Sequence, residues 1–243
     1  MRICVINPNT TTSMTDKIGE AARHAASQGT EIIACTSPSG PESIESHFDE
    51  SLSVPGLLEV IRQGEIEGYD GYVIACFGDP GLLAARELTS KPVIGIAEAA
   101  MRIASLISTH FSVVTTLSRT IVIAEHLARQ YGVEHLCRRI RAADVAVLEL
   151  EDPASDSYRR VRDEAKRALV EDGAGAIVLG CGGMADLARC LSEDLGVPVI
   201  DGVSAAVKLV EALVELKLGT SKVGDLAYPL PKRFTGQFAH LSH

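Results

Sequence analysis

The sequence predicts an α/β protein of two similar lobes, each a parallel sheet flanked by helices, related by a pseudo-twofold axis. Two observations support this fold class. Short Val- and Ile-rich runs alternate with segments of helical period along the 243 residues, which is typical of parallel sheets wrapped by helices. In addition, two stretches about a hundred residues apart repeat one another.

The first half of the chain contains four of these apolar runs. The segment after Asn7 is rich in Thr and Ser, which cap helices, and Asp79-Pro80 is a favourable helix start. The expected strands are 3–6, 31–34, 72–75 and 93–96, and the expected helices are 13–27, 54–67, 80–89 and 97–108.

The second half follows the same alternation. Its expected strands are 112–115, 145–148, 177–179 and 197–200, and its expected helices are 118–130, 156–171, 184–194 and 203–218. The longest connection, 36–46, is rich in Ser, Pro and Gly, and loops of this length often close over a site. The tail after Gly219 looks irregular and is expected to pack on the surface.

The repeat places a cysteine at the end of one strand in each half. Cys76 stands 16 positions before Pro92, and Cys181 stands 17 positions before Pro198. The helices after the two prolines would carry the chain across to the second lobe and back. The predicted lobes are therefore 1–97 plus 206–243, and 98–205.

Both cysteines are expected at one edge of the fold. Ligands of open α/β sheets bind beyond the carboxyl ends of the strands. Cys76, Cys181, Asn7 and Thr115 all follow or end predicted strands there. Four matched strand ends from two related lobes define one cleft, and we expect the active site in it.

Two opposed thiols suit proton transfer at a carbon atom. One thiolate takes a proton from one face, and one thiol delivers a proton to the other, so that a stereocentre inverts without a cofactor. Gly182 and Gly183 follow Cys181, and a helix start there would favour the thiolate and lower its pKa. Their backbone N–H groups would also stabilise an enolate. Cys76 and Cys181 are thus the predicted catalytic residues.

Neighbouring residues are predicted to bind the substrate. Asn7 and the hydroxyl pair Thr115 and Thr116 lie at the same edge, although Thr and Ser near Asn7 also serve as helix caps. Asp79 is a candidate too, with helix capping as its structural alternative. The full predicted binding set is Asn7, Phe77, Gly78, Asp79, Thr115, Thr116, Gly182 and Gly183.

Composition excludes several classes of function. With Lys+Arg 23 and Asp+Glu 32 the net charge is −9, and the absence of a basic stripe argues against nucleic acid and anionic membranes as partners. The six scattered cysteines form no C-x-x-C pair, and the histidines show no metal spacing, so no metal site is expected. The N-terminus lacks the apolar stretch of a secretory signal, which predicts a cytoplasmic protein.

These residues resemble the Asp/Glu/hydantoin racemase superfamily, in particular its hydantoin and allantoin racemase branch. The resemblance implies a cofactor-independent two-base mechanism with Cys76 and Cys181 as the bases, and a homo-oligomer. The glutamate and aspartate branch has Asn-Thr after its first cysteine and Thr after its second. Phe77-Gly78 and Gly182-Gly183 stand here instead and suit a flat, neutral ring better. The matching segments are 6–10, 41–45, 75–82, 92–95, 113–116 and 178–184.

The leading hypothesis is racemisation of a 5-substituted hydantoin at its ring carbon C5, which is flanked by a carbonyl. Allantoin, itself a 5-ureido-hydantoin, is the close alternative, and decarboxylase or maleate isomerase chemistry is more distant. A second class is an NAD(P)-dependent oxidoreductase, because Gly180 to Ala185 fits G-x-G-x-x-A after a strand, with Asp201 further on. However, little chain remains beyond Asp201 for a dinucleotide enzyme. A third class is a non-catalytic small-molecule binding protein, which would not need two matched thiols.

Overall fold

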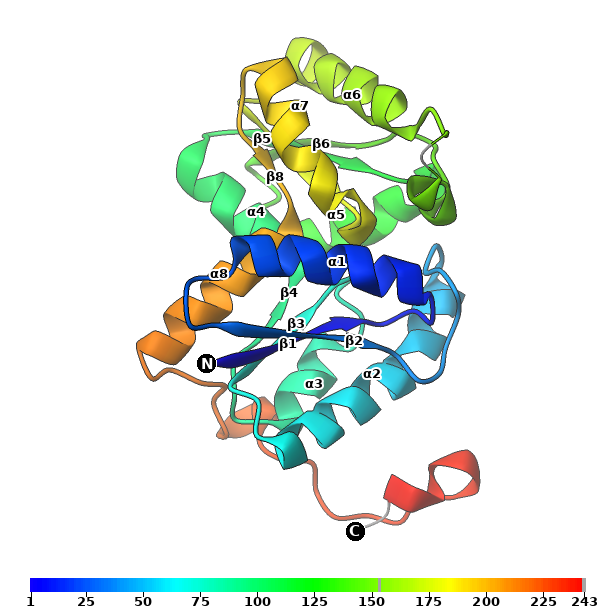
Figure 1. Cartoon of the computed structure of the whole chain (residues 1–243), viewed down its shortest axis with the longest axis vertical. Coiled ribbons are helices and arrows are strands. Elements are labelled where there is room, and N and C mark those ends of the chain that lie inside the picture. Colours follow the sequence, from blue (N-terminus) through cyan, green and yellow to red (C-terminus); the bar gives the residue numbers. More distant parts are fainter. Residues whose placement is uncertain (153, 242–243) are drawn as a thin grey trace.

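Two four-stranded parallel sheets form the framework of the protein (Figure 1). The computed structural model describes residues 1–152 and 154–241. The strand orders are β2-β1-β3-β4 in the first sheet and β6-β5-β7-β8 in the second, so both sheets have the same topology. The two-lobed α/β fold is confirmed, and the shared strand order is the structural counterpart of the sequence repeat.

The first sheet and its helices are built from the N-terminal part of the chain. Its central strands are fully buried, because helices cover both faces of the sheet, and they are accordingly almost continuously apolar. The elements are β1 (Arg2–Asn7), α1 (Thr12–Ala25), β2 (Glu31–Thr36), α2 (His47–Glu67), β3 (Gly71–Ile74), α3 (Leu82–Leu88) and β4 (Val93–Gly95).

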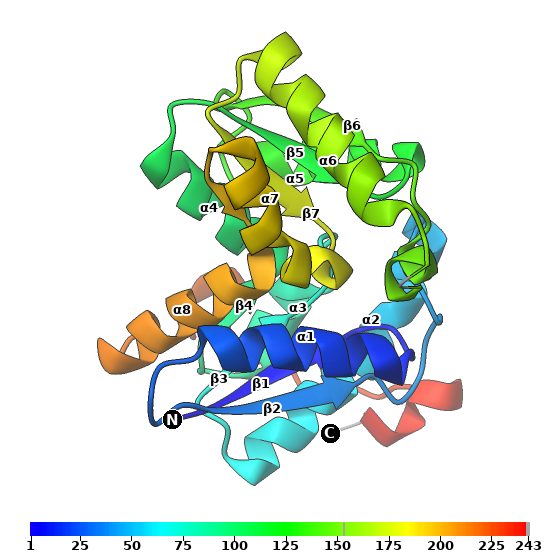
Figure 2. The same cartoon turned by 45° about the horizontal axis from the view of Figure 1, so that its top comes forward.

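The second sheet repeats this plan, and two helices that lie side by side, α4 and α8, join the two lobes (Figure 2). Helices α4 and α8 leave β4 and β8, cross between the sheets and pack against each other. The elements are α4 (Ile96–Ile107), β5 (Phe111–Thr115), α5 (Ile121–Gln130), β6 (Cys137–Ala142), α6 (Ser157–Arg167), β7 (Ala176–Gly180), α7 (Ala188–Leu195), β8 (Val199–Ile200) and α8 (Gly202–Glu215).

The predicted strand 145–148 is wrong. The strand that pairs with β5 is β6, which comes earlier in the chain and carries three arginines. Strand β6 lies at the edge of its sheet, where charged side chains reach water and discourage pairing with other chains. Val145 and Val147 are instead buried from a loop and the 3₁₀ turn η2 (Val147–Glu151), whereas Leu148 is exposed.

Other element boundaries also differ from the prediction. Helix α2 begins at His47, not at residue 54, and includes Pro55 in its interior. The Ser46 hydroxyl caps it by accepting a hydrogen bond from the Asp49 N–H at 3.2 Å. Helix α7 begins only at Ala188, because the six residues after Cys181 form the 3₁₀ turn η4 (Gly182–Leu187).

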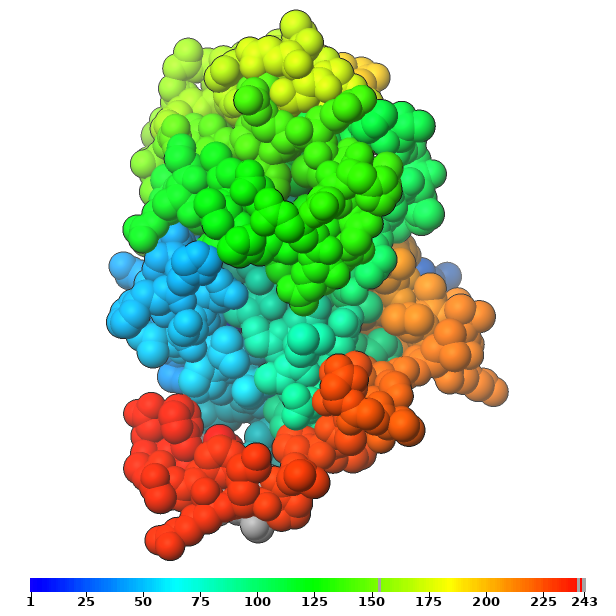
Figure 3. All heavy atoms as spheres, turned by 180° about the vertical axis from the view of Figure 1, so that it is seen from behind, coloured from blue at the N-terminus to red at the C-terminus, as the bar shows by residue number. Residues whose placement is uncertain are grey.

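The C-terminal segment runs along the end of the first lobe that faces away from the second lobe (Figure 3). Thr220 N–H donates to the Ser90 carbonyl at 2.9 Å, which ties the start of this segment to the first lobe. The predicted lobe boundaries stay a prediction, and residues 242 and 243 of the first lobe lie outside the described residues. Within the described part of the chain, no helix has the length and apolar character needed to cross a bilayer.

Candidate active site

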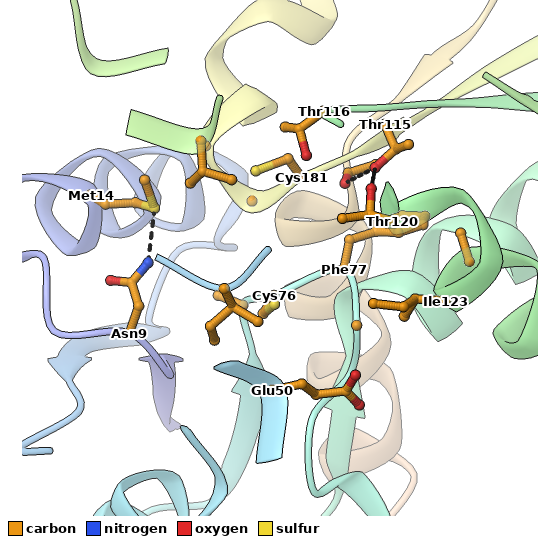
Figure 4. A pocket seen from close by; sticks show the side chains of 18 of the residues that line it. Asn9, Met14, Glu50, Cys76, Phe77, Thr115, Thr116, Thr120, Ile123 and Cys181 are labelled. Atoms are coloured by element: carbon orange, nitrogen blue, oxygen red, sulfur yellow. Dashed lines mark hydrogen bonds between the residues drawn. The ribbon is translucent and has the colours of Figure 1, made fainter. Parts of the chain in front are cut away.

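One cavity lies where the carboxyl ends of both sheets meet (Figure 4). Strands β1 and β3 of the first sheet and β5 and β7 of the second all end at it. Nine of the ten predicted site residues line it; the exception is Asp79. The lining residues are Asn7, Asn9, Met14, Ile44, Glu50, Ala75, Cys76, Phe77, Gly78, Thr115, Thr116, Thr120, Ile123, Ala124, Val147, Gly180, Cys181, Gly182 and Gly183.

The two cysteines occupy turns of the same geometry. The Cys76 carbonyl accepts a hydrogen bond from the Asp79 N–H at 3.0 Å, and the Cys181 carbonyl accepts one from the Met184 N–H at 3.2 Å. The amide two residues after each cysteine, that of Gly78 or Gly183, acts to lower the pKa of its thiol. The sequence repeat therefore extends to the backbone hydrogen bond that closes each cysteine turn.

A glycine allows these two turns to touch. A Cβ atom on Gly182 would lie 2.7 Å from the Ala75 carbonyl oxygen, closer than real Cβ atoms approach backbone. Because these residues adjoin Cys181 and Cys76, the contact brings the two cysteine turns together. Figure 4 shows both sulfurs directed into the cavity, one from each lobe.

Burial raises the pKa of both thiols more than the turns lower it. It raises the pKa of Cys76 to about 12 and that of Cys181 to about 11, although the Gly78 and Gly183 amides oppose the shifts. Lys17 helps to keep the pKa of Cys181 the lower of the two. The expected lowering of the Cys181 pKa is therefore wrong: only a short 3₁₀ turn follows this residue, and burial raises its pKa more than the Gly183 amide lowers it.

We expect alkylation of the cavity thiols to depend steeply on pH. The thiolate is the reactive form, so the rate at Cys181 should rise about tenfold per pH unit from about pH 7 to 9.5, with Cys76 reacting more slowly throughout. Peptide mass spectrometry after short exposures to iodoacetamide measures both rates, with N-acetylcysteine as the reference. A plateau below about pH 8 at either residue would contradict the raised pKa values.

Asp79 does not line the cavity. Its carboxylate accepts hydrogen bonds from the Ala97 and Glu98 N–H groups, at 3.0 and 2.9 Å, and from the Tyr131 hydroxyl at 2.6 Å. It packs so closely on Gly95 that a Cβ atom there would lie 2.2 Å from the Asp79 Cγ. Asp79 thus caps α4, not the helix after its own turn, and burial raises its pKa to about 7.

The Asn7 side chain is occupied within its own loop. Its Nδ2 donates to Asn9 Oδ1 at 2.7 Å, Thr15 Oγ1 at 3.0 Å and the Thr11 carbonyl at 3.1 Å, and its Oδ1 accepts from the Asn9 N–H at 3.2 Å. The Asn9 Nδ2, in contrast, donates to the Met14 thioether, a weak acceptor, at 3.3 Å. Asn7 therefore shapes the cavity wall, and Asn9 carries the amide better placed for a ligand.

Three threonines line the cavity, and one of them also joins two strands. Thr115 Oγ1 donates to the Gly180 carbonyl at 3.2 Å and lies 3.0 Å from Thr120 Oγ1, so it holds β5 to the end of β7. Thr116 and Thr120 also line the cavity. Thr120 comes from the turn before α5, which the sequence did not single out.

Two hydrogen bonds join the two lobes near the cavity. Glu45 Oε1 accepts a hydrogen bond from the Val147 N–H at 2.8 Å, and Lys17 Nζ donates to the Leu150 carbonyl at 2.9 Å. Glu45 belongs to the long loop 36–46, and its neighbour Ile44 lines the cavity. The loop thus reaches the site, as its length predicts.

Several cavity residues were missed by sequence reasoning. Asn9, Met14, Glu50 and Ile123 come from four different segments, and only the fold brings them together. The Asn-Pro-Asn-Thr run signalled Asn9, whereas Glu50 has no local signal. Among the described residues, no group of three or more His, Cys, Asp or Glu side chains is arranged to hold a metal ion.

Comparison with known proteins shows the family of this chain. The model of the Asp/Glu/hydantoin racemase family matches residues 3–210. The chain belongs to this family. A hydantoin racemase from Pseudomonas sp. (strain NS671) is 50% identical over 236 residues, covering 97% of this chain and 95% of that protein.

Solved structures of allantoin racemases are similar over the whole fold. The Klebsiella pneumoniae enzyme has 58% identity and a TM-score of 0.97, covering 100% of this chain and 99% of its own. The Pseudomonas fluorescens enzyme has 40% identity and a TM-score of 0.91, covering 97% and 100%. These full-length similarities make the chain an isomerase of the racemase class.

The dinucleotide alternative conflicts with the local structure of this racemase. In a G-x-G-x-x-A turn the second glycine lets the cofactor pyrophosphate approach the backbone. The corresponding Gly182 is buried against the Ala75 carbonyl instead. The glycines of this turn therefore serve the contact between the two cysteine segments.

Proposed function

We propose that this racemase interconverts the D and L forms of 5-substituted hydantoins by two-base proton transfer at C5, with Cys76 and Cys181 as the bases. The observation that carries the proposal is the pair of matched turns, each directing one sulfur into the same cavity from its own lobe. Opposed bases are what inversion at a single carbon requires.

The proton transfer is balanced within the site. The thiolate of one cysteine removes the C5 proton and becomes a thiol, and the electron pair moves onto the adjacent ring carbonyl as an enolate. The thiol of the other cysteine then protonates C5 on the opposite face and becomes a thiolate. The reverse reaction uses the same residues in exchanged roles, so both enantiomers are substrates.

Backbone and amide donors support the enolate. Gly182 lines the cavity, and the Asn9 Nδ2, whose partner is a weak acceptor, can donate to a ring carbonyl. The Gly183 amide is directed at the Cys181 sulfur, which stabilises that residue as the thiolate. Phe77 adds an apolar wall that suits the face of a flat, neutral ring.

Allantoin is the second candidate substrate. The similarity of the whole chain to an allantoin racemase at 58% identity favours it, beside 50% identity to a hydantoin racemase. Both compounds share the hydantoin ring and the acidic C5 hydrogen, so the same mechanism serves either. They differ in the substituent on C5.

Isotope incorporation tests the proposal. One enantiomer of 5-isopropylhydantoin or allantoin is incubated in deuterated buffer near neutral pH, with a sample lacking enzyme to correct for spontaneous exchange. We expect the enantiomer formed in the first turnovers to carry deuterium at C5, as measured by chiral chromatography with mass detection. Loss of optical rotation without deuterium at C5 would rule out proton transfer with solvent-equilibrated thiols.

A further inference from the structure

Glu50 brings a carboxylate to the Cys76 side of the cavity. It lies in the first turns of α2 and lines the cavity beside Ile123 (Figure 4). A Cβ atom built on Gly78 would be 3.9 Å from the Cys76 Sγ and 3.9 Å from the Glu50 Cδ. The Glu50 Cδ is therefore at most 7.8 Å, twice 3.9 Å, from the Cys76 Sγ. A small substituent on the reacting carbon can bridge such a distance.

The Glu50 carboxylate is held in place by few contacts within the protein. Among the described residues it makes one ion pair, with His47 Nδ1 at 3.8 Å. The His47 side chain is 70% exposed, whereas that of Glu50 is 27% exposed. Burial raises the pKa of Glu50 from its usual value, which indicates that water solvates it incompletely. An ionised carboxylate in this position gains most from a ligand that donates hydrogen bonds.

We infer that Glu50 is a specificity-determining residue that accepts hydrogen bonds from N–H groups on the C5 substituent of the substrate. The inference rests on the proposed hydantoin racemisation and names the substrate class of that site. A ureido substituent, as in allantoin, carries three N–H donors, whereas alkyl and aryl substituents carry none. The Glu50 carboxylate gains hydrogen bonds from a ureido substituent. Beside an alkyl or aryl substituent it loses water and gains no hydrogen bond in return.

The proposed role gives Glu50 no direct part in proton transfer. Cys76 and Cys181 face the reacting carbon, and Glu50 contacts the part of the substrate beyond it. Its removal should therefore change which hydantoin is preferred and leave the chemistry of C5 intact. This separation gives the test two independent readouts.

The test compares two substrates in three variants. Racemisation of allantoin and of 5-isopropylhydantoin is measured for the unmodified chain, Glu50→Leu, Glu50→Gln and the control Glu59→Leu, which alters an exposed carboxylate on the same helix. For Glu50→Leu we expect kcat/KM for allantoin to fall about 10- to 100-fold, mainly through KM, while that for 5-isopropylhydantoin stays the same or rises. Glu50→Gln keeps an acceptor oxygen and should lose less than Glu50→Leu.

The outcomes separate the two proposals. Equal losses for both substrates in Glu50→Leu and Glu50→Gln, or unchanged use of allantoin in both, would overturn the role of Glu50 and leave racemisation intact. Failure of the unmodified chain to racemise either compound would instead refute the proposed function. Thermal melting of each variant identifies a folding defect, and Glu50→Gln, which keeps the size and shape of the side chain, then carries the comparison.

Discussion

Replacing either Cys76 or Cys181 with serine is expected to abolish racemisation of both enantiomers, with kcat/KM falling about 10³-fold or more. A serine hydroxyl is far less acidic than a thiol, so it neither forms a base nor donates a proton readily near neutral pH. Each direction of the reaction needs one residue as base and the other as acid. Loss of either therefore stops both directions, and circular dichroism of each enantiomer over time measures this.

Cys190 provides the matched control for these replacements. It is exposed and lies on α7, outside the cavity. Cys190→Ser should racemise both enantiomers at the rate of the unmodified chain. A serine variant at residue 76 or 181 that kept more than about a tenth of the activity in both directions would show that its thiol is not an essential base.

The largest expected loss of stability comes from Arg141→Met. The Arg141 side chain is 3% exposed, and its guanidinium donates to Asp172 at 2.6 and 2.7 Å, Glu164 at 3.0 Å and Glu171 at 2.7 Å. Without it, the Asp172 carboxylate keeps a hydrogen bond from the Ser112 hydroxyl and a longer ion pair with the exposed Arg139. Removing one partner of a buried ion pair typically costs about 3–5 kcal/mol of unfolding free energy, which urea denaturation measures.

Arg139→Met is the control, because the Arg139 side chain is 61% exposed and its contact with Asp172 is longer, at 3.8 Å. We expect it to change the unfolding free energy by less than about 1 kcal/mol. The pH dependence gives a second check. Hydrogen bonds from Arg141 hold the pKa of Asp172 below its usual value, so this stabilisation is present above about pH 4 and is lost as the pH falls further. Equal denaturation midpoints for the two variants would contradict the argument.

The sequence pattern predicted seven of the eight strands and missed the charged edge strand β6. The central strands, such as β3 and β7, are buried on both faces, so their apolar runs are unmistakable. Strand β6 is an edge strand, and its arginines either reach solvent or, like Arg141, enter an ion-pair network that periodicity does not reveal. The predicted helix 54–67 begins too late, because the first turns of α2 are polar and Pro55 lies within the helix.

Some residues of the candidate site could be predicted from the sequence, and others could not. The two cysteines could be predicted because the duplication placed them at matching strand ends. Glu50 depends on how separate segments of the chain meet, and no local sequence pattern encodes that. Asp79 was predicted to bind the substrate because it lies close to Cys76 in the sequence. In the structure its turn directs the carboxylate toward the start of α4 instead.

Hydrogen exchange by the single-cysteine variants tests the central geometric claim most directly. If the two sulfurs face opposite sides of C5, then Cys76→Ser and Cys181→Ser should each exchange the C5 hydrogen of one enantiomer for deuterium without racemising it. The preferred enantiomers of the two variants should be opposite. Exchange of the same enantiomer by both variants would place the two thiols on one face of the substrate and contradict this account.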